Sequence, residues 1–242
     1  MKILDKFKIK LQNRETAPSV TIAFLGDSIT EGCFEIYTDK LGNIQTCVDA
    51  ENVYHNKLKR IFSMLYPTVP LNIINAGISG NCSWDALKRI ESDVIRHSPD
   101  LCVICFGVND AFTESGDNEK NFYDSVKAMV KILQNNDIET ILMTSPMNCT
   151  KVSCRLSDPS LIETAKRVSE IEKSGTLERF ANITRKVSKE TGVPLCDCYG
   201  KWKTLYNSGV DVTSLLANYI NHPNRDMHNL FAYMLTETIF EK

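Results

Sequence analysis

The sequence predicts a three-layer α/β/α sandwich, and three observations support this. The chain has 242 residues, a length that suits one large α/β domain with a sizeable core. Strand-like and helical segments alternate along it, as in parallel sheets whose strands are connected by helices. The strand-like segments are almost continuously hydrophobic, as strands buried on both faces must be. We therefore expect residues 1–242 to form a single domain.

Five short segments rich in apolar and β-branched residues are the predicted strands. They run from Val20 to Gly26, Leu71 to Ala76, Leu101 to Gly107, Thr140 to Ser145 and Val193 to Cys198. Four segments with apolar residues three and four positions apart are the predicted helices, at residues 51–66, 84–97, 119–135 and about 158–191. Open parallel sheets bind ligands outside the carboxyl ends of their strands, so functional residues are expected just after each strand.

Composition narrows the range of partners and locations. The 28 lysines and arginines nearly balance the 30 aspartates and glutamates, so no strong field attracts nucleic acid or an anionic membrane. A small molecule is the expected partner. The first twenty residues are charged throughout and lack the apolar stretch of a signal peptide, and no segment is long enough to span a bilayer, which predicts a cytoplasmic location.

The nine cysteines are predicted to be free thiols. The one CxxC motif, Cys102 and Cys105, has no second pair to complete a zinc site and lies within an apolar strand-like run. Cys196 and Cys198 lie in a similar run. A reduced cysteine packs in such a place as a small hydrophobic residue, which argues against a disulfide framework.

Ser28 is the candidate nucleophile. The first predicted strand leads directly into GDSITEG, residues 26–32. A serine on a tight turn after a buried strand can present its hydroxyl and its own amide to one substrate atom, and flanking glycines permit the turn. The alternative is a structural glycine-rich turn capped by Asp27 or Ser28.

Two further strand ends carry candidate oxyanion donors. The second strand ends in NAGISGN, residues 75–81, where backbone amides can point into a site. A glycine loop before a helix can instead bind phosphate, but neither GxGxxG nor GxxxxGK[ST] is present. The third strand ends in FGVND, and the side-chain amide of Asn109 could be another donor, although this motif taken alone is better explained as a turn asparagine.

His222 is the candidate general base among four histidines. His55 and His97 fall in or at the end of predicted helices, remote from strand ends, and are interpreted as structural. His222 lies in NHPN, on a loop ahead of the last amphipathic helix, where the following proline keeps the chain extended. His228 lies one to two turns into that helix and is interpreted as a structural residue.

GDSITEG, GISGN, GVND and a late HPN, in this order, resemble the SGNH hydrolase family, also called GDSL esterases and lipases. The resemblance spans residues 20–240 and implies a flavodoxin-like sandwich with a five-stranded parallel sheet, no metal and no cofactor. It also implies hydrolysis of acyl esters through an acyl-serine. By position, Ser28 matches the nucleophile and His222 the base, while the amides of Ser28 and Gly80 and the side chain of Asn109 match the oxyanion donors.

The third member of the catalytic triad departs from the family pattern. The family usually has an aspartate three residues before the histidine, where this chain has Tyr219. An inserted residue would put Asn218 in the aspartate's place, and an asparagine can hold a histidine tautomer. Our order of candidates to orient the imidazole is a backbone carbonyl or Asn218, then Asp226, then Asp211.

A long segment, residues 33–50, leaves the same strand end as Ser28 and is expected to form a pocket wall or a lid. Its polarity favours a small polar ester, such as an O-acetylated sugar, over a long-chain lipid. A lysophospholipase or thioesterase is the first rival, with an acyl channel built from Phe34, Phe112 and Met147. The second is a non-catalytic binding protein on the same scaffold, which the missing aspartate would explain. A nucleotide-binding regulator would need a phosphate motif that is absent.

Overall fold

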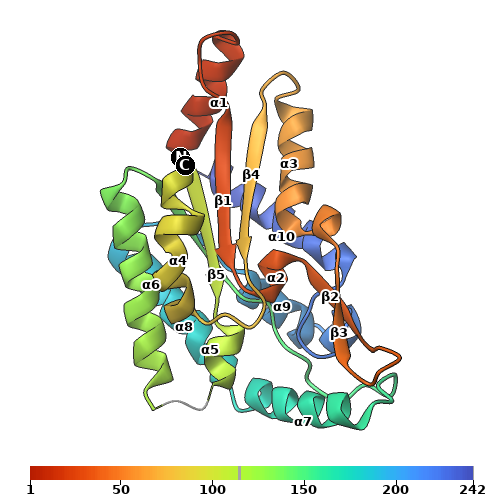
Figure 1. The fold of residues 1–242 in the computed structure, drawn as a ribbon. Coiled ribbons are helices and arrows are strands. Elements are labelled where there is room, and N and C mark those ends of the chain that lie inside the picture. Colours follow the sequence, from red (N-terminus) through yellow and green to blue (C-terminus); the bar gives the residue numbers. More distant parts are fainter. Residues whose placement is uncertain (114–115, 242) are drawn as a thin grey trace.

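The main sheet of the protein lies between two layers of helices in a computed structural model that describes residues 1–113 and 116–241 (Figure 1). Its strands are β1 (Val20–Gly26), β4 (Leu71–Gly77), β5 (Leu101–Phe106), β6 (Glu139–Thr144) and β7 (Leu195–Cys196). The α-helices are α1 (Lys2–Gln12), α2 (Ser28–Glu31), α3 (Tyr54–Leu65), α4 (Ser83–Asp93), α5 (Val108–Phe112), α6 (Asn118–Asn135), α7 (Pro159–Lys173), α8 (Thr176–Thr191), α9 (Cys198–Asn207) and α10 (Arg225–Phe240). Short 3-10 turns span Ala50–Asn52, Ile95–His97 and Val212–Leu215.

The five strands are all parallel, in the order β4-β1-β5-β6-β7. Counted along the chain within this sheet, the order is 2-1-3-4-5, which is that of flavodoxin-like folds. The predicted three-layer sandwich with a five-stranded parallel sheet is therefore confirmed. The chain order reverses beside β1, so the carboxyl ends of β4, β1 and β5 are where a ligand site is expected.

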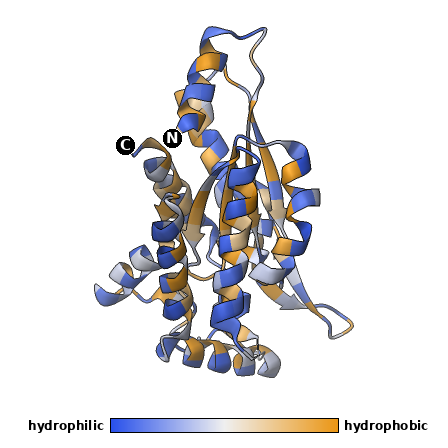
Figure 2. Ribbon diagram, turned by 90° about the vertical axis from the view of Figure 1, so that its left-hand side faces the viewer, coloured by the Kyte–Doolittle hydropathy of each residue, from blue (hydrophilic) through white to orange (hydrophobic). Residues whose placement is uncertain are grey.

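Both faces of the sheet are buried, and β1 shows this directly. Ile22 and Phe24 pack in a cluster with α1, α3 and α10, whereas Ala23 and Leu25 pack in a second cluster with α4, α6 and α8. Figure 2 shows mostly hydrophobic strands between helices that carry both hydrophobic and hydrophilic residues. A strand with two buried faces reads as a continuous apolar run, which explains why the sequence identified these strands.

Several elements differ from the predicted ones. The helical segment at 158–191 is two helices, because Gly175 adopts φ +72° between α7 and α8. The last strand is limited to Leu195–Cys196, since the next residue, Asp197, accepts the Gly200 amide with its side chain and begins α9. Helices α1, α2, α5 and α9 were not predicted.

Residues 33–50 fold into an antiparallel hairpin outside the main sheet, made of β2 (Cys33–Thr38) and β3 (Ile44–Val48). Figure 1 shows the hairpin beyond the carboxyl ends of β1 and β4. Its first strand follows α2 directly, because Gly32 adopts φ +109° and turns the chain out of the helix. The hairpin therefore begins within a few residues of Ser28.

Gly77, the last residue of β4, allows α2 to pack against the end of the sheet. A Cβ at this position would lie 2.2 Å from the backbone nitrogen of Glu31 and 2.6 Å from the carbonyl carbon of Thr30. Backbone atoms cannot swing aside as a flexible side chain does. The position of the helix that carries Ser28 therefore depends on a residue without a side chain at position 77.

Gly77→Ala is expected to lower the free energy of unfolding by about 3 kcal/mol, because it forces α2 away from β4. Urea denaturation measures this. Gly192→Ala is the control: Gly192 has φ +71°, but a Cβ added there would meet open space, so only backbone strain of about 1 kcal/mol opposes the substitution. A Gly77→Ala protein as stable as Gly192→Ala would show that the close approach does not matter.

Candidate active site

Ser28 is the first residue of α2 and sits directly after β1 and Asp27. The Asp27 side chain caps the helix, accepting the backbone N–H of Ile29 at 3.0 Å. The first N–H groups of a helix have no acceptor within the helix, so the Ser28 amide is available as a donor. Ser28 is buried, with 6% of its surface exposed.

His222 is bound through both ring nitrogens. Its Nε2 lies 3.1 Å from Ser28 Oγ, and its Nδ1 lies 3.1 Å from the backbone oxygen of Phe34 on β2. A carbonyl oxygen can only accept a hydrogen bond, so Nδ1 carries the hydrogen. In the neutral ring Nε2 then has the free lone pair and accepts the Ser28 hydroxyl, which is the polarity that a general base requires.

Burial keeps the imidazole neutral. It lowers the pKa of His222 to about 4, because a charged ring loses its hydration there, and the hydrogen bond to Phe34 opposes this only in part. At neutral pH the ring is therefore unprotonated, and its Nε2 lone pair can accept the Ser28 hydroxyl.

Asn218 does not hold the imidazole, so the prediction that its side chain orients His222 directly is wrong. Its Oδ1 accepts three backbone N–H groups, from Ile220 at 3.0 Å, Asn221 at 2.9 Å and His222 at 3.0 Å. The ring contact belongs instead to the other first-ranked candidate, a backbone carbonyl. Asn218 fixes the loop on which His222 lies, because its side-chain oxygen accepts hydrogen bonds from successive backbone amides of the turn.

The remaining candidates for orienting the ring point elsewhere. Tyr219, at the family's aspartate position, has φ +56°, and its hydroxyl accepts a hydrogen bond from Arg155 Nη1 at 3.2 Å. Asp211 forms an ion pair with Lys151 at 2.8 Å. Asp226 is exposed in the first turn of α10. Both ring nitrogens of His222 have other partners, so none of these three side chains orients the imidazole.

The other two predicted oxyanion residues, Gly80 on a loop and Asn109 in α5, lie on segments that are hydrogen-bonded to each other. The amide of Gly80 has no hydrogen-bond partner within the described residues, and Ser79 just before it donates its N–H to Glu31 Oε2 at 2.6 Å. Asn109, in α5, donates one side-chain N–H to the backbone oxygen of Asn81 at 3.0 Å. An amide group has two N–H donors, so the second stays available.

Arg89 on α4, which the sequence did not single out, ties three of these segments together. Its guanidinium donates to the backbone oxygens of Gly26 at 3.0 Å and Ala76 at 2.8 Å, and to the side chain of Asn81 at 2.9 Å. One planar group thus joins the ends of β1 and β4 to the loop after Gly80. An arginine in the middle of an amphipathic helix gives no sequence signal of this role.

Two buried carboxyl groups lie behind the nucleophile. Burial raises the pKa of Asp27 to about 7 and that of Asp110 to about 6. Asp110 Oδ1 accepts both the amide and the hydroxyl of Ser83, at 2.8 and 2.6 Å, and so anchors the start of α4. Because the pKa of Asp27 is near neutral, its carboxyl group carries less negative charge beside the candidate nucleophile than an ordinary aspartate would.

Sequence comparison places the chain among known proteins. A model of the GDSL-like lipase/acylhydrolase family matches residues 24–230. The chain belongs to this family. The predicted class, a carboxylic ester hydrolase of the GDSL type, is confirmed by this membership.

Individual GDSL-like relatives agree with the match. An acetylxylan esterase from Geobacillus stearothermophilus is 26% identical over 193 residues, covering 76% of this chain and 80% of the relative. The uncharacterized lipoprotein YqeF of Bacillus subtilis (strain 168) is 31% identical over 142 residues, 55% of this chain and 56% of that one. The crystal structure of Axe2, an acetylxylan esterase from Geobacillus stearothermophilus, superposes with a TM-score of 0.67 at 19% identity, over 92% of this chain and 95% of that one.

A cleft adjoins the His222 loop of this GDSL-like protein. It has a volume of about 690 Å³ and lies between β2, the loop at residues 155–158, and residues 217–219. The predicted role of residues 33–50 as a pocket wall fits this position, because β2 forms one side of the cleft. The lining is largely polar and includes two tyrosines, Tyr37 and Tyr219.

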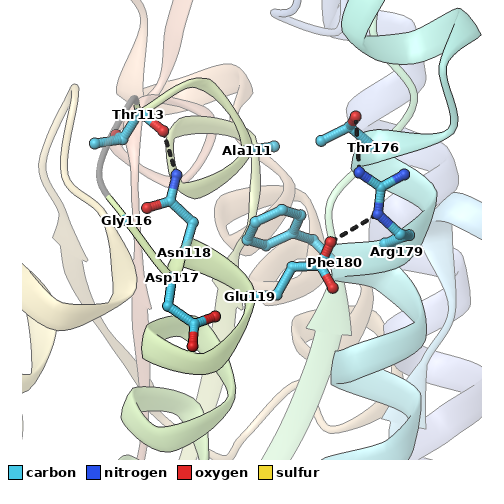
Figure 3. Close-up of a pocket in the computed structure, with 9 residues that line it drawn as sticks. All are labelled: Ala111, Thr113, Gly116, Asp117, Asn118, Glu119, Thr176, Arg179 and Phe180. Atoms are coloured by element: carbon cyan, nitrogen blue, oxygen red, sulfur yellow. Dashed lines mark hydrogen bonds and ion pairs between the residues drawn. The ribbon is translucent and has the colours of Figure 1, made fainter.

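A second pocket, of about 420 Å³, lies between the end of α5, the start of α6, and α8 (Figure 3). Its arginine, Arg179, is already paired with Glu119 at 2.7 Å and with Thr176 at 3.2 Å. None of the predicted catalytic residues lines it. Ser28 and His222 line neither pocket, but residues 217–219 of the His222 loop line the first cleft, which is therefore the better candidate for the substrate.

Neither a membrane span nor a metal-binding cluster is found in residues 1–113 and 116–241. No helix there combines the length and the apolar character needed to cross a bilayer. The same part of the chain holds no group of three or more His, Cys, Asp or Glu side chains placed to bind a metal ion.

The imidazole of His222 is expected to stay neutral at about pH 5.5 in the folded protein, where a histidine in the unfolded chain is largely protonated. The reason is that the folded pKa, about 4, lies below the ordinary value of 6.5. Acidification through this window therefore protonates the unfolded state first and lowers stability. NMR titration of the ring resonances, assigned with His222→Gln, measures the pKa. A value near 6.5 would contradict the burial argument.

Proposed function

We propose that the protein is a serine ester hydrolase that cleaves a small acyl group, most simply acetyl, from a polar or carbohydrate alcohol. The observation that carries this proposal is the hydrogen bond of 3.1 Å between Ser28 Oγ and His222 Nε2, with Nδ1 of the same ring held by a carbonyl. Acyl transfer through a serine requires a nucleophile hydrogen-bonded to a base, and the base in turn hydrogen-bonded to an orienting group.

The reaction proceeds in two halves. Ser28 Oγ attacks the ester carbonyl carbon while its proton passes to His222 Nε2, which gives a tetrahedral oxyanion. Collapse of this species breaks the bond to the alcohol oxygen, and His222 returns the proton to the leaving alcohol. A water molecule then attacks the acyl-serine with His222 again as base, which releases the carboxylic acid and restores Ser28.

The oxyanion is stabilised by the amides of Ser28 and Gly80 and the second side-chain N–H of Asn109. Support comes from the bonds that fix these segments: Glu31 to the residue before Gly80, and Asn109 to the residue after it. Each such donor is worth about 3 kcal/mol of activation energy when it is preorganised in a site that excludes water.

The Phe34 carbonyl takes the place of the aspartate of the usual triad. It fixes the tautomer of His222 and the orientation of the ring, as the carboxylate does. It carries a partial and not a full negative charge, so it stabilises the imidazolium less. Burial, which lowers the pKa of His222, likewise disfavours the charged imidazolium that forms in the transition state.

A small acyl group suits the packing around the site better than a long chain. Two of the three residues that would line a channel in a lysophospholipase or thioesterase, Phe34 and Met147, belong to the hydrophobic core, at 0% and 1% exposure, and the third, Phe112, is partly buried against it. The cleft beside His222 is polar and suits an alcohol rich in hydroxyl groups. The acetylxylan esterase among the relatives points the same way.

A non-catalytic binding protein is the weaker alternative. Its only support was the missing aspartate, and a carbonyl now occupies the corresponding side of the ring. A scaffold that had lost catalysis would have no need to hold Ser28 and His222 within hydrogen-bonding distance.

A cytoplasmic location is part of the proposal. It is supported by the cysteines, all nine of which are free thiols, as expected in a reducing compartment.

Asn218→Ala is expected to lower kcat by about tenfold and to reduce the melting temperature, because three backbone N–H groups of the His222 loop lose their acceptor. Asp211→Ala and Asp226→Ala are the controls and should leave kcat near the wild-type value. Steady-state kinetics with p-nitrophenyl acetate measures the effect. A loss of activity confined to one of the aspartate variants would identify that aspartate as the orienting group.

Hydrolysis of p-nitrophenyl acetate by the wild type is expected to fall by at least about a thousandfold in both Ser28→Ala and His222→Ala. Longer acyl homologues should be turned over more slowly than acetate, because two of the three side chains that would line an acyl channel are packed into the core. Wild-type activity that survives both substitutions would place the chemistry elsewhere. Preference for long acyl chains would favour the lipase alternative.

A further inference from the structure

The Phe34 carbonyl lies on an element that is weak by itself. The hairpin β2–β3 stands outside the main sheet, and its register shifts between Cys33 and Ile36, so Phe34 and Glu35 lie in an irregular stretch of the ladder. Such a bulge frees backbone groups and redirects the strand, and a two-stranded hairpin is only marginally stable in isolation. Contacts outside the ladder must therefore fix the position of this carbonyl.

Arg225 supplies such contacts from the side of His222. It is the first residue of α10, three positions after the histidine. Its Nη1 and Nη2 donate to the two carboxylate oxygens of Glu35, at 2.5 and 3.1 Å, and its Nε donates to Asp49 at 2.7 Å. The guanidinium also lies over the ring of Phe34, 4.4 Å from its centroid. One side chain thus holds Phe34, the residue after it, and the segment that follows β3.

The loop between the histidine and this arginine is itself fixed by hydrogen bonds. Ala217 donates its N–H to the backbone oxygen of His222 at 2.7 Å, and Asn224 donates to Leu215 at 2.8 Å. The Asn224 side chain caps α10 by accepting the amide of Met227. Arg225 and His222 therefore belong to one rigid unit. The hydrogen bonds from Arg225 to Glu35 on β2 thus set the distance between the Phe34 oxygen and the imidazole.

We propose that Arg225, through Glu35 and Asp49, is a positioning residue that takes over the structural task of the absent aspartate. The aspartate of the usual triad would hold the ring directly. In this chain, charged side chains hold the backbone segment whose carbonyl holds the ring. The inference rests on the proposed function, since it requires His222 to act as the base.

The exposure of these side chains separates positioning from general stability. The side chains of Arg225 and Glu35 are 34% and 46% exposed, and ion pairs this accessible to water contribute little to the free energy of unfolding. A small displacement of a catalytic group, in contrast, has a large effect on rate. Loss of the guanidinium should therefore change catalysis far more than stability.

The test compares wild type with Arg225→Met, Arg225→Lys and Glu35→Gln in two assays: kcat and KM for p-nitrophenyl acetate, and the rate at which diisopropyl fluorophosphate inactivates the enzyme. For Arg225→Met we expect kcat and the inactivation rate to fall together by about tenfold to a hundredfold, with KM and the melting temperature near wild type. Arg225→Lys, which keeps the charge but loses the fork, should recover part of both rates.

Arg185→Met is the matched control. Arg185, on α8, binds both carboxylate oxygens of Asp197, at 3.0 and 2.9 Å, and this pair has a similar exposure of 29% and 36%. Its remaining hydrogen bond within the described part of the chain goes to Asn182, at 2.6 Å, on the same helix. These partners belong to neither the His222 loop nor the hairpin, so both rates should match wild type.

The rates of these variants decide between the outcomes. Wild-type rates in Arg225→Met overturn the proposal, as do equal losses in Arg185→Met. If Arg225→Met does not fold, Glu35→Gln decides instead, because this variant keeps the hydrogen bond between Arg225 and Asp49. Unchanged rates in a folded Glu35→Gln protein overturn the proposal, and reduced rates support it. Failure of the proposed function gives a different result. The wild type would then neither hydrolyse p-nitrophenyl acetate nor be inactivated by diisopropyl fluorophosphate, or Ser28→Ala would react as the wild type does. Either result would also overturn the positioning role.

Discussion

The hydrogen bond between the Phe34 oxygen and His222 Nδ1 is the constraint on which the rest of the site depends. It decides which nitrogen carries the hydrogen, and so whether the lone pair faces Ser28 or faces away. A ring turned over, or charged, could not accept the serine proton. Three segments therefore have to keep fixed positions relative to one another, although they belong to different parts of the chain: the loop of His222, the bulged strand β2 and the turn after β1.

The parallel sheet fixes the relative positions of these segments. Its strand order brings the ends of β4, β1 and β5 together, and each end presents one element of the site. Gly77 lets α2 pack against β4, and Arg89 joins two strand ends to the neighbouring loop. The chemistry is thus carried by short segments, and the positions of these segments are determined by a core that is buried on both sides.

Much of this could be predicted from the sequence, and the limits have physical causes. The strands were visible because two buried faces produce continuous apolar runs. Ser28 was visible from its glycine-flanked turn after a buried strand, and His222 because it is one of only four histidines. The Phe34 carbonyl was beyond reach as a specific group, since every residue has one and only the fold selects it. Asn218 was placed correctly beside the histidine, but its oxygen faces the backbone of the loop and not the ring, a choice that sequence spacing cannot reveal.

The position of the orienting group has an evolutionary consequence. In α/β enzymes, the segments that connect the strands vary more among homologues than the sheet does, and they carry many of the binding and catalytic residues. Here the excursion β2–β3 both borders the cleft and supplies the partner of the imidazole. Specificity and rate are therefore coupled in one hairpin, so a chimera that exchanges it to alter substrate choice would inherit or lose the histidine's alignment at the same time.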